Sequence, residues 1–519
     1  MTPKLIKSLL KPTAYPEPTA TVRLIETHVS FIFVTDTFAY KVKKPVDFGF
    51  LNFTTLDRRR FYCEEEVRLN RRLCPDIYLD VVELHATPEG GCFGGSGPVI
   101  DYAVKMKRLP EDRMLTHLLE NGALGPAQMA QIARVIADFH GRAARGARID
   151  AMGSAAAIRG NWEENFRQAE LFETATLSRA DLAMMHDWVE RFLVEHEDFL
   201  RARVAGGFIR ECDGDLHLGN ICLTDPVCIF DCIEFNERFR FIDTAADIAF
   251  LLMDLEYAGR ADLCAPFLEA YQEATGDLGL TELLDFYKAY RAFVRGKVKG
   301  FRLSETGLAP EELLATKTAA SRYFRLARGY CLRERLPPTL IITCGVMGSG
   351  KSVLSRELAF ELGLWMERSD LVRKTLAGVT PTERTTEEFD QGIYGAASTR
   401  ATYQALLEGV RVALLAGKSS IVDATFRLRS DRAAFRGLAK QLEVPFFVVE
   451  TRCDEGLIRE RLEKRRLDPG EVSDGRWELF ARQLSEFEAT EPGEAITVDS
   501  SLPLAEQVDL VLRGMGILS

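Results

Sequence analysis

Two stretches of this chain carry residue types at spacings that suit phosphate chemistry. The first is the run 345–352, with the sequence GVMGSGKS. Its glycines let backbone N–H groups converge on phosphate oxygens, and the start of a following helix adds partial positive charge. Lys351 can reach the outer phosphates, and Ser352 can ligate Mg²⁺. The residues predicted to hold a nucleotide here are Gly345, Gly348, Ser349, Gly350, Lys351 and Ser352.

The surroundings of this run agree with a phosphate-binding P-loop. The apolar run 340–344 precedes it as an expected buried strand, and a helix is expected from Lys351 onward. A glycine-rich turn with a surface lysine is the structural alternative. Because the motif and both flanking elements agree, the P-loop is the favoured interpretation.

The second stretch is 208–231, which contains the loop DGDLHLGN at 213–220. Its pattern predicts a loop, a tight hairpin and an acidic residue at the exit of the hairpin. The spacing brings Asp215, Asn220 and Asp231 to one place. Oxygen-bearing side chains in this arrangement suit two tasks, which are orienting a hydroxyl group and holding Mg²⁺ beside nucleotide phosphates.

The segments near the N-terminus predict a small lobe that carries lysines. Lys41 and Lys43 fall on one face of an expected strand, while Tyr40 and Val42 on the other face point to the core. A charged segment at 56–73 has helical periodicity and contains Glu66. A glycine-rich turn is expected at 90–97. The five strands expected around this helix are 21–26, 31–35, 38–43, 81–84 and 99–106.

Beyond Pro110 the pattern is mainly helical to about Leu336, and strands alternate with helices after Pro337-Pro338. Alternating strands and helices predict a parallel sheet covered on both faces, which binds its ligand beyond the C-terminal ends of the strands. We therefore predict an α/β multidomain chain. Its expected domains are 1–335, with a small lobe at about 1–109 and a helical lobe at about 110–335, and a doubly wound P-loop domain at 339–519.

The composition of the 519 residues is that of a globular protein with a sizeable core, since 46% are hydrophobic and 28% are charged. The net charge of -11 argues against non-specific binding to nucleic acid or to an anionic membrane. It mildly favours a small neutral or cationic acceptor over a nucleic-acid end. Eleven cysteines without paired CxxC spacing predict reduced core thiols. No apolar run approaches ~18 residues, so we expect a cytoplasmic protein without a membrane segment.

Residues 1–335 resemble the aminoglycoside phosphotransferases and, more distantly, the protein kinases. The resemblance rests on DGDLHLGN at 213–220 and on IFD at 229–231. It implies a bilobal, protein-kinase-like α+β fold. It also implies that Asp215 is the catalytic aspartate that faces the acceptor hydroxyl and that Asn220 and Asp231 hold the metal ion.

The same resemblance implies roles for residues outside the motif. Lys41, or Lys43 on the same face, would contact the α and β phosphates and pair with Glu66. Residues 104–109 would form the hinge that receives adenine, and Asp247 would brace the catalytic loop from a helix.

Two features depart from the pattern of that family. Asp213 stands where the family usually has histidine. An unpaired carboxylate there would repel nucleotide phosphates or raise the pKa of a neighbour, unless a metal ion or an arginine compensates. The strand-connecting loop 27–30 also lacks the usual glycines, although its hydroxyls and amides can still donate to phosphate.

Residues 339–519 resemble the P-loop kinases of small molecules and of polynucleotide 5′ ends, including the zeta-toxin and gluconate-kinase relatives. The segment SDLVR at 369–373 matches their Asp-x-x-Arg motif. The resemblance implies that Asp370 is the general base, that Arg373 contacts the acceptor, and that Asp423 joins Ser352 at the metal ion.

An arginine-dense helix in the same domain resembles the lid that closes on the transferring phosphate. Its arginines are Arg459, Arg461, Arg465 and Arg466, of which we expect Arg461 and Arg465 to contact the nucleotide. Phosphoryl transfer needs positive charge around the γ-phosphate in a dry site, which such a lid supplies. The alternative is a solvated helix whose arginines pair with neighbouring glutamates.

Together the halves resemble a bacterial family of bifunctional proteins, described as aminoglycoside phosphotransferase-like, ATP-binding predicted kinases. The resemblance implies an ATP- and Mg²⁺-dependent phosphotransferase with two nucleotide sites and hydroxyl acceptors, with a small molecule favoured. Two alternatives stay open. Either the N-terminal domain is a regulatory or degenerate nucleotide-binding module, or the chain is a polynucleotide 5′-hydroxyl kinase or an ATPase triggered by a macromolecule. The sequence identifies neither the acceptor nor the oligomeric state.

Overall fold

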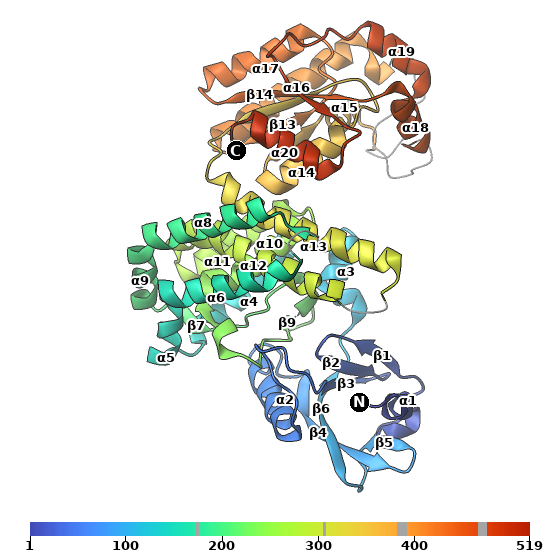
Figure 1. The fold of residues 1–519 in the computed structure, drawn as a ribbon, viewed down its shortest axis with the longest axis vertical. Helices are drawn as coiled ribbons and strands as arrows, with labels where there is room; N and C mark the ends of the chain where they lie inside the picture. Colours follow the sequence, from blue (N-terminus) through green and yellow to red (C-terminus); the bar gives the residue numbers. More distant parts are fainter. Residues whose placement is uncertain (173–175, 305–307, 381–391, 466–474, 519) are drawn as a thin grey trace. The chain divides into compact units, whose positions relative to one another are not determined.

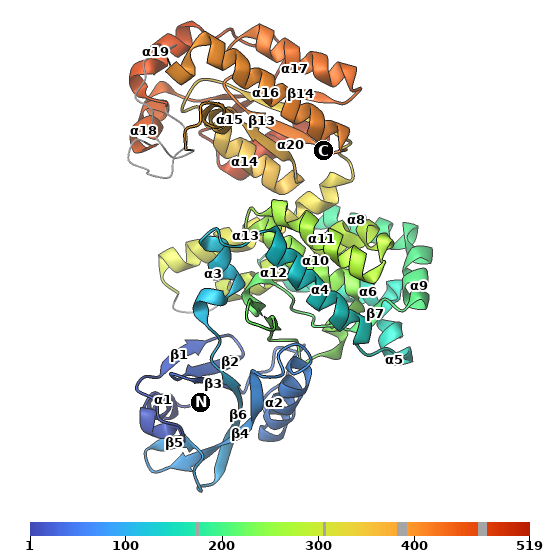
Figure 2. The ribbon, with the colours of Figure 1, turned by 180° about the vertical axis from the view of Figure 1, so that it is seen from behind.

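A computed structural model describes residues 1–172, 176–304, 308–380, 392–465 and 475–518. Contacts divide the chain into two compact units, Met1–Phe324 and Arg325–Ser519. This division falls within helix α13 (Pro310–Arg333), a little before the boundary that the sequence predicted. Figures 1 and 2 show both units from opposite sides.

The first unit begins with an antiparallel sheet of six strands in the order β1-β2-β3-β6-β4-β5. Helix α2 begins at Thr55, whose hydroxyl caps the helix by accepting the N–H of Arg58. Five of the strands overlap predicted ones. The elements of this small lobe are α1 Pro3–Leu9, β1 Arg23–Glu26, β2 Ser30–Val34, β3 Phe38–Lys43, α2 Leu56–Asn70, β4 Tyr78–Thr87, β5 Gly90–Phe93 and β6 Val99–Lys107.

Strand β5 lies where the sequence predicted part of a glycine-rich turn, and that prediction is wrong there. Helix α1 approaches β5 closely, because the N–H of Gly91 donates to Ser8 Oγ at 3.0 Å. A Cβ atom on Gly91 would lie 2.6 Å from Leu5 Cδ1. The glycines therefore make room for α1, in addition to turning the chain.

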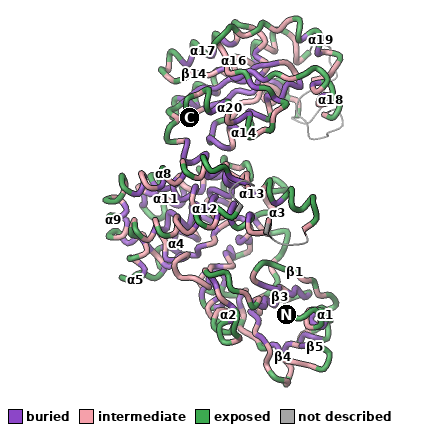
Figure 3. The backbone as a smooth tube through the Cα atoms, viewed as in Figure 1, coloured by how far each residue is buried: buried purple, intermediate pink, exposed green. Residues whose placement is uncertain are grey.

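The rest of the first unit is mainly helical, as predicted. Two short antiparallel pairs, β7 with β10 and β8 with β9, hold the loop 212–220. Helices α10 and α12 supply many of the buried residues of this lobe (Figure 3). The elements are α3 Leu115–Glu120, α4 Pro126–Arg142, α5 Ala147–Asp150, α6 Ala155–Ala169, α8 Arg179–Glu195, α9 Glu197–Gly206, β7 Ile209–Glu211, β8 Ile221–Cys222, β9 Cys228–Ile229, β10 Phe241–Asp243, α10 Thr244–Tyr257, α11 Cys264–Thr275, α12 Thr281–Phe301 and α13.

One pair of cysteines differs from the prediction of reduced thiols. Cys74 and Cys228 form a disulfide between residues that lie 154 positions apart. Sequence spacing could not reveal this pair, because only the fold brings the two side chains together. The other nine cysteines remain thiols, and most of them are buried.

The second unit contains a parallel sheet in the order β12-β13-β11-β14-β15, with the strand before the P-loop at its centre. Helices lie on both faces of the sheet (Figures 1 and 2), which confirms the doubly wound α/β fold. The elements are β11 Leu340–Cys344, α14 Lys351–Leu362, β12 Trp365–Arg368, α15 Ser369–Leu376, α16 Ala396–Leu415, β13 Ser420–Asp423, α17 Arg429–Gln441, β14 Phe446–Arg452, α18 Glu455–Arg465, α19 Trp477–Ser485, β15 Ile496–Asp499 and α20 Leu504–Gly514. Among all the helices described, none combines the length and the apolar character that crossing a membrane requires.

Candidate phosphoryl-transfer sites

The loop between β7 and β8 holds Asp215 and Asn220 against each other. Asn220 Nδ2 donates hydrogen bonds to the main-chain oxygen and to Oδ2 of Asp215, both at 3.1 Å. These bonds use the donor side of the Asn220 amide, so its oxygen is the atom that can face a cation. Asp215 is partly exposed and lines a cavity of about 890 Å³.

The surroundings of Asp215 keep its carboxyl ionised. Burial by itself raises the pKa of Asp215, but His217 and the charges of two arginines, Arg295 and Arg291, outweigh it and lower the pKa below the usual value. His217 Nδ1 accepts the N–H of Gly219 at 3.0 Å, so the ring proton lies on Nε2, which is 3.5 Å from Asp215 Oδ2. An ionised Asp215 can accept a hydrogen bond from an acceptor hydroxyl.

The carboxyl of Asp213 lies in a different environment from that of Asp215. It is buried, and its Oδ1 accepts the N–H of Asp215 at 3.1 Å. Burial, together with the charges of Asp247 and Asp215, raises the pKa of Asp213 well above its usual value. The environment therefore favours the neutral carboxyl and suppresses the extra negative charge that the sequence suggested at this position.

Replacing Asp213 by asparagine is expected to stabilise the first unit at neutral pH. As the pH rises above about 4, the unfolded chain releases the Asp213 proton while the folded protein retains it, so this group lowers the stability of the native protein. Asparagine keeps the acceptor oxygen and removes the titration. Thermal unfolding of the full chain should give a Tm advantage for Asp213→Asn that grows from pH 4 to pH 8 and reaches about 2 °C or more. A loss of stability that increases with pH would contradict the neutral carboxyl.

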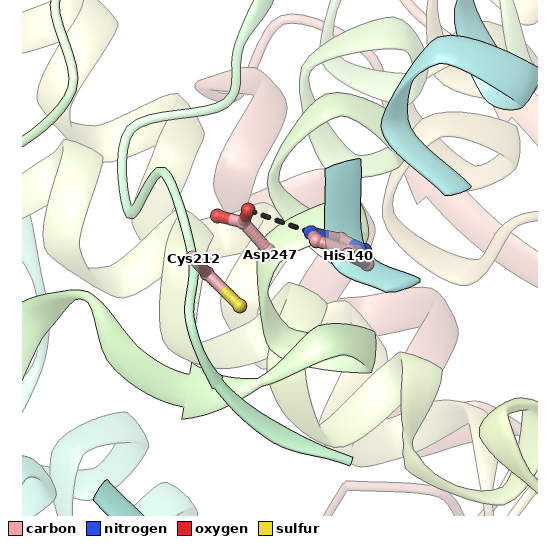
Figure 4. A group of neighbouring side chains, drawn as sticks. All are labelled: His140, Cys212 and Asp247. Atoms are coloured by element: carbon pink, nitrogen blue, oxygen red, sulfur yellow. Dashed lines mark hydrogen bonds and ion pairs between the residues drawn. The ribbon is translucent and has the colours of Figure 1, made fainter. Parts of the chain in front are cut away.

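Asp247 on α10 braces the loop 212–220 and lies beside His140 and Cys212 (Figure 4). Its carboxylate oxygens accept the N–H groups of Asp213 at 3.1 Å and Gly214 at 2.9 Å, as the resemblance to phosphotransferases led us to expect. His140 Nε2 lies 3.1 Å from the same carboxylate, and Cys212 completes a group that could in principle hold a metal ion. Because backbone N–H groups and His140 already occupy the Asp247 oxygens, we interpret the cluster as a structural support.

Both lysines of β3 reach the glutamate predicted on α2. Lys41 Nζ lies 2.9 Å from Glu66 Oε1, and Lys43 Nζ lies 2.6 Å from Glu66 Oε2. Lys41 also pairs with Asp231, and Lys43 pairs with Glu234. Of the two lysines, Lys41 lines the cavity, whereas the Lys43 side chain is only 1% exposed. Lys41 is therefore in the better position to contact phosphate.

Asp231 has an unusual backbone conformation, and Tyr78 binds its main-chain N–H group. Its φ of +65° lies in the left-handed region, which is uncommon for an aspartate. The N–H of Asp231 donates to Tyr78 Oη at 3.1 Å. Tyr78 gave no signal in the sequence, because it reaches the site only through the packing of β4.

The glycines of the P-loop are required by both conformation and space. Gly345, Gly348 and Gly350 have φ values of 140°, 77° and 99°. A Cβ atom on Gly345 would lie 2.7 Å from the main-chain oxygen of Thr451, and one on Gly350 would lie 2.8 Å from Ser500 Cβ. The loop can therefore follow this path only with glycine at these two positions.

Lys351 lies across the P-loop and donates to the main-chain oxygen of Val346 at 2.8 Å. Burial lowers the pKa of Lys351, while Asp423 and Asp370 raise it and Arg465 lowers it further. The net result is a lowered pKa. The predicted metal ligand, the predicted base and one predicted lid arginine are therefore among the charges that act on the lysine.

Ser349 and Ser352 have separate positions in the loop. Ser349 is buried and shares a hydrogen bond of 2.7 Å with Thr451 Oγ1. Ser352 follows Lys351 in the first turn of α14 and is partly exposed.

The P-loop is also tied to α19, because Gln483 Oε1 accepts the N–H of Met347 at 2.6 Å. Gln483 was not singled out from the sequence, since it lies 136 residues further along the chain.

Arg461 ties helix α18 to the P-loop and to the end of β15. Its guanidinium donates to Ser500 Oγ at 2.8 Å and to the main-chain oxygen of Ser500 at 2.7 Å, and it lies 3.4 Å from the oxygen of Gly348. Arg465 is the last residue of α18. Arg466, which the sequence also assigned to the lid, lies outside the described residues.

Arg459 fits the solvated-helix alternative. It pairs with Glu463 at 3.0 Å, and the two side chains are 60% and 63% exposed. The arginines of α18 are therefore divided between one face that meets the P-loop and another that meets solvent.

Asp370 and Arg373 lie together on α15. The guanidinium of Arg373 donates to the main-chain oxygen of Ile393 at 2.9 Å and to Thr399 Oγ1 at 3.1 Å, and it lies over the Tyr394 ring. Arg373 thus holds the start of α16 in place. Close by, Arg368 Nε lies 3.7 Å from Asp423 Oδ2.

Two domain families match the chain. Residues 58–290 match the Phosphotransferase enzyme family, and residues 340–490 match a family described as AAA domain. The chain is 33% identical over 438 residues to the uncharacterized protein Rv2004c of Mycobacterium tuberculosis (strain ATCC 25618 / H37Rv), with 84% of each chain covered. The uncharacterized protein Mb2027c of Mycobacterium bovis matches with the same identity and coverage.

Several solved structures each match about a third of the chain. A sugar kinase from Janibacter sp. HTCC2649 is 21% identical, covers 35% of this chain and 99% of its own, and gives a TM-score of 0.26. A gluconokinase from Sinorhizobium meliloti 1021 is 23% identical, with coverages of 34% and 92% and a TM-score of 0.26. Kti12 of Chaetomium thermophilum, solved with ADP-AlF3, is 16% identical, with coverages of 35% and 99% and a TM-score of 0.28.

The domain matches agree with the two architectures described above. A phosphotransferase domain of kinase-like fold precedes a P-loop nucleotide-binding domain on a parallel sheet. The chain therefore belongs to the same family as the mycobacterial proteins Rv2004c and Mb2027c and is a kinase-type phosphotransferase.

Proposed function

We propose that this chain is an ATP- and Mg²⁺-dependent phosphotransferase with two separate nucleotide sites, each of which transfers a γ-phosphate to the hydroxyl group of a small molecule. One observation carries the proposal. Each unit has its own set of phosphate, metal and base residues, with Lys41, Asp231 and Asp215 around the cavity of the first and Lys351, Asp423 and Asp370 in the second. All three residues of each set belong to one unit.

In the N-terminal site, Asp215 accepts the hydrogen bond of the acceptor hydroxyl and orients it, while Asn220 holds the carboxylate. The donor set fits Mg²⁺, because the oxygen of Asn220 and the carboxylate of Asp231 are hard ligands and the Asp231 side chain is 43% exposed. Mg²⁺, when bound there, offsets the negative charge of the phosphates. Lys41 supplies positive charge to the phosphate tail and is positioned by Glu66.

In the C-terminal site, the amides of the P-loop bind phosphate and Lys351 neutralises charge on the outer phosphates. Ser352 and Asp423 supply oxygen ligands that suit Mg²⁺. Asp370 accepts the proton of the acceptor hydroxyl, and Arg465 adds positive charge. Arg461 and Arg373 position the lid helix and the start of α16 through the contacts described above.

Nucleotide stoichiometry tests the proposal directly. Calorimetric titration of the full chain with AMPPNP and Mg²⁺ is expected to give two nucleotides per chain. Lys351→Ala and Lys41→Ala should each weaken one of the two binding events by about tenfold or more. Arg459→Ala, a change on the solvent face of α18, should leave both events unaltered. A single binding event that disappears with Lys351→Ala would contradict an N-terminal nucleotide site.

The degenerate-module alternative rested on Asp213. Burial and the charges of Asp247 and Asp215 raise the pKa of Asp213, and this weakens the motivation, because a neutral carboxyl does not repel phosphate. We therefore favour two active sites.

A further inference from the structure

The cavity beside Asp215 is where an acceptor of the N-terminal site must lie. Its volume of about 890 Å³ falls in the range of about 300–1,000 Å³ that is common for small-molecule sites. Lys41 and Asp231 line it where the phosphate tail is expected. Much of the remaining wall comes from helices α6 and α12 and from the segments 48–51 and 233–239, with further residues from the segments 27–32 and 152–153 and from α10. We therefore expect the acceptor to contact those walls.

The acceptor walls are rich in aromatic side chains. The Phe50 ring lies 6.0 Å from the Phe235 ring and 6.4 Å from the Phe239 ring, and all three line the cavity. A second aromatic group comes from the helices, where Trp162 and Tyr290 meet edge to face at 5.2 Å. Such rings gain most from contact with another flat apolar surface.

The carboxylates of the cavity are already neutralised, apart from the catalytic one. Among the described lining residues, these carboxylates are Asp215, Asp231, Glu234 and Asp243. The last three pair with Lys41, Lys43 and Arg203. Apart from Asp215, a cationic acceptor would therefore find no unpaired carboxylate on the described walls to offset the loss of its hydration.

The acceptor walls themselves carry positive charge. Arg291 is buried and donates to the main-chain oxygens of Gly214 and Ala246, at 2.9 and 3.0 Å. Lys297 is also buried, and its ammonium group donates to two neutral amides, Asn165 at 2.6 Å and Gln168 at 2.7 Å. These contacts satisfy hydrogen bonds without adding negative charge, so the walls repel amino groups.

Three polar atoms of α6 are left for a ligand. Trp162 Nε1, Asn161 Oδ1 and Asn165 Nδ2 are buried and have no hydrogen-bond partner among the described residues, and all three residues line the cavity. Buried polar atoms are normally paired. Two are donors and one is an acceptor, so neutral groups such as hydroxyls or amides would satisfy them.

We propose, on the basis of the function proposed above, that the acceptor of the N-terminal site is an aromatic alcohol without positive charge. The polycationic amino sugars of the phosphotransferases that this domain resembles do not suit these walls. The negative net charge of the whole chain favoured a neutral or cationic acceptor. The charges on the walls of the cavity differ from that average. In the step itself, the hydroxyl oxygen bonds to the γ-phosphorus, the bond to the β–γ bridging oxygen breaks, the hydroxyl proton passes to Asp215 and ADP leaves.

A matched set of probes tests this inference in the full chain carrying Lys351→Ala, so that turnover reports the N-terminal site. The probes are 2-phenylethanol, 2-(4-aminomethylphenyl)ethanol, sorbitol and neamine. In calorimetry with Mg·AMPPNP present, 2-phenylethanol should bind about tenfold or more tightly than its aminomethyl counterpart. With Mg·ATP it should also yield a phosphate ester. Tight binding and phosphorylation of sorbitol or neamine, with none of 2-phenylethanol, would overturn the inference and leave the proposed function standing.

Two variants separate the aromatic walls from general effects on folding. Phe50→Ala and Phe235→Ala should each weaken binding of 2-phenylethanol by about tenfold while AMPPNP affinity is retained. Phe61→Ala, on the exposed side of α2 and outside the cavity, is the matched control and should bind both ligands normally. Binding of 2-phenylethanol that Phe50→Ala and Phe235→Ala leave unchanged would contradict the inference. Binding that these changes weaken, without any ester formation, would support the ligand class and contradict the proposed transfer reaction.

Discussion

Replacing Asp215 by asparagine should reduce phosphoryl transfer at the N-terminal site by about 10³-fold. A positioned general base contributes roughly 10²–10⁴-fold, and the amide cannot take the proton of the acceptor hydroxyl. Nucleotide affinity should stay within a few-fold, because Asp215 faces the acceptor. The measurement is formation of the phosphate ester by the full chain carrying Lys351→Ala, together with calorimetric titration of AMPPNP.

Asp213→Asn provides the comparison for this prediction. The two aspartates lie in the same loop, but the surroundings of Asp213 favour its neutral form while those of Asp215 favour the ionised form. Asparagine at 213 preserves the acceptor oxygen for the N–H of Asp215, so ester formation should stay within a few-fold of the Lys351→Ala parent. Equal losses in both variants would mean that the loop geometry, and not the charge of Asp215, limits the reaction.

Replacing Lys351 by alanine should reduce turnover at the C-terminal site by about 10²–10³-fold. Phosphoryl transfer depends on fixed positive charge around the γ-phosphate, and removal of one such group commonly costs this much. The P-loop should keep its shape, because its path depends on glycines and on contacts with Thr451 and Gln483. The measurement is ATP turnover by the full chain carrying Asp215→Asn, which silences the first site.

Arg459→Ala is the matched control for Lys351→Ala. Both changes remove one cationic side chain from the second unit, but Arg459 is 60% exposed and pairs with an exposed glutamate. Exposed pairs contribute little, so turnover should remain within about twofold. If Lys351→Ala retained full turnover in the Asp215→Asn chain, the P-loop would not be a catalytic phosphate site.

Several conclusions depended only on the sequence, because the groups concerned are close neighbours along the chain. The P-loop needs one strand end, one glycine loop and one helix start, all within residues 340–352, and the structure has these elements in that order. The loop and hairpin between Asp215 and Asp231 are equally local. The alternation of strands and helices was enough to predict the parallel sheet and the fold class.

The tertiary structure decided the features that depend on distant segments. It distinguished Lys41 from Lys43, since one lines the cavity and the other is enclosed. It added Tyr78 and His140, which reach the site from β4 and α4. It also showed that burial and the charges of Asp247 and Asp215 raise the pKa of Asp213, which depends on contacts that the sequence does not reveal.

The cavity beside Asp215 is the clearest example of a feature that the fold decides and the sequence does not. Its walls include the β3–α2 connection, α6, the segment 233–239 and α12, which are spread along the chain from Phe48 to Phe301. Residue types and spacing could therefore predict candidate reacting groups, because those groups are close neighbours along the chain. Only the fold could determine what those groups face, because burial, pairing of charges and the shape of a cavity depend on contacts between distant parts of the chain.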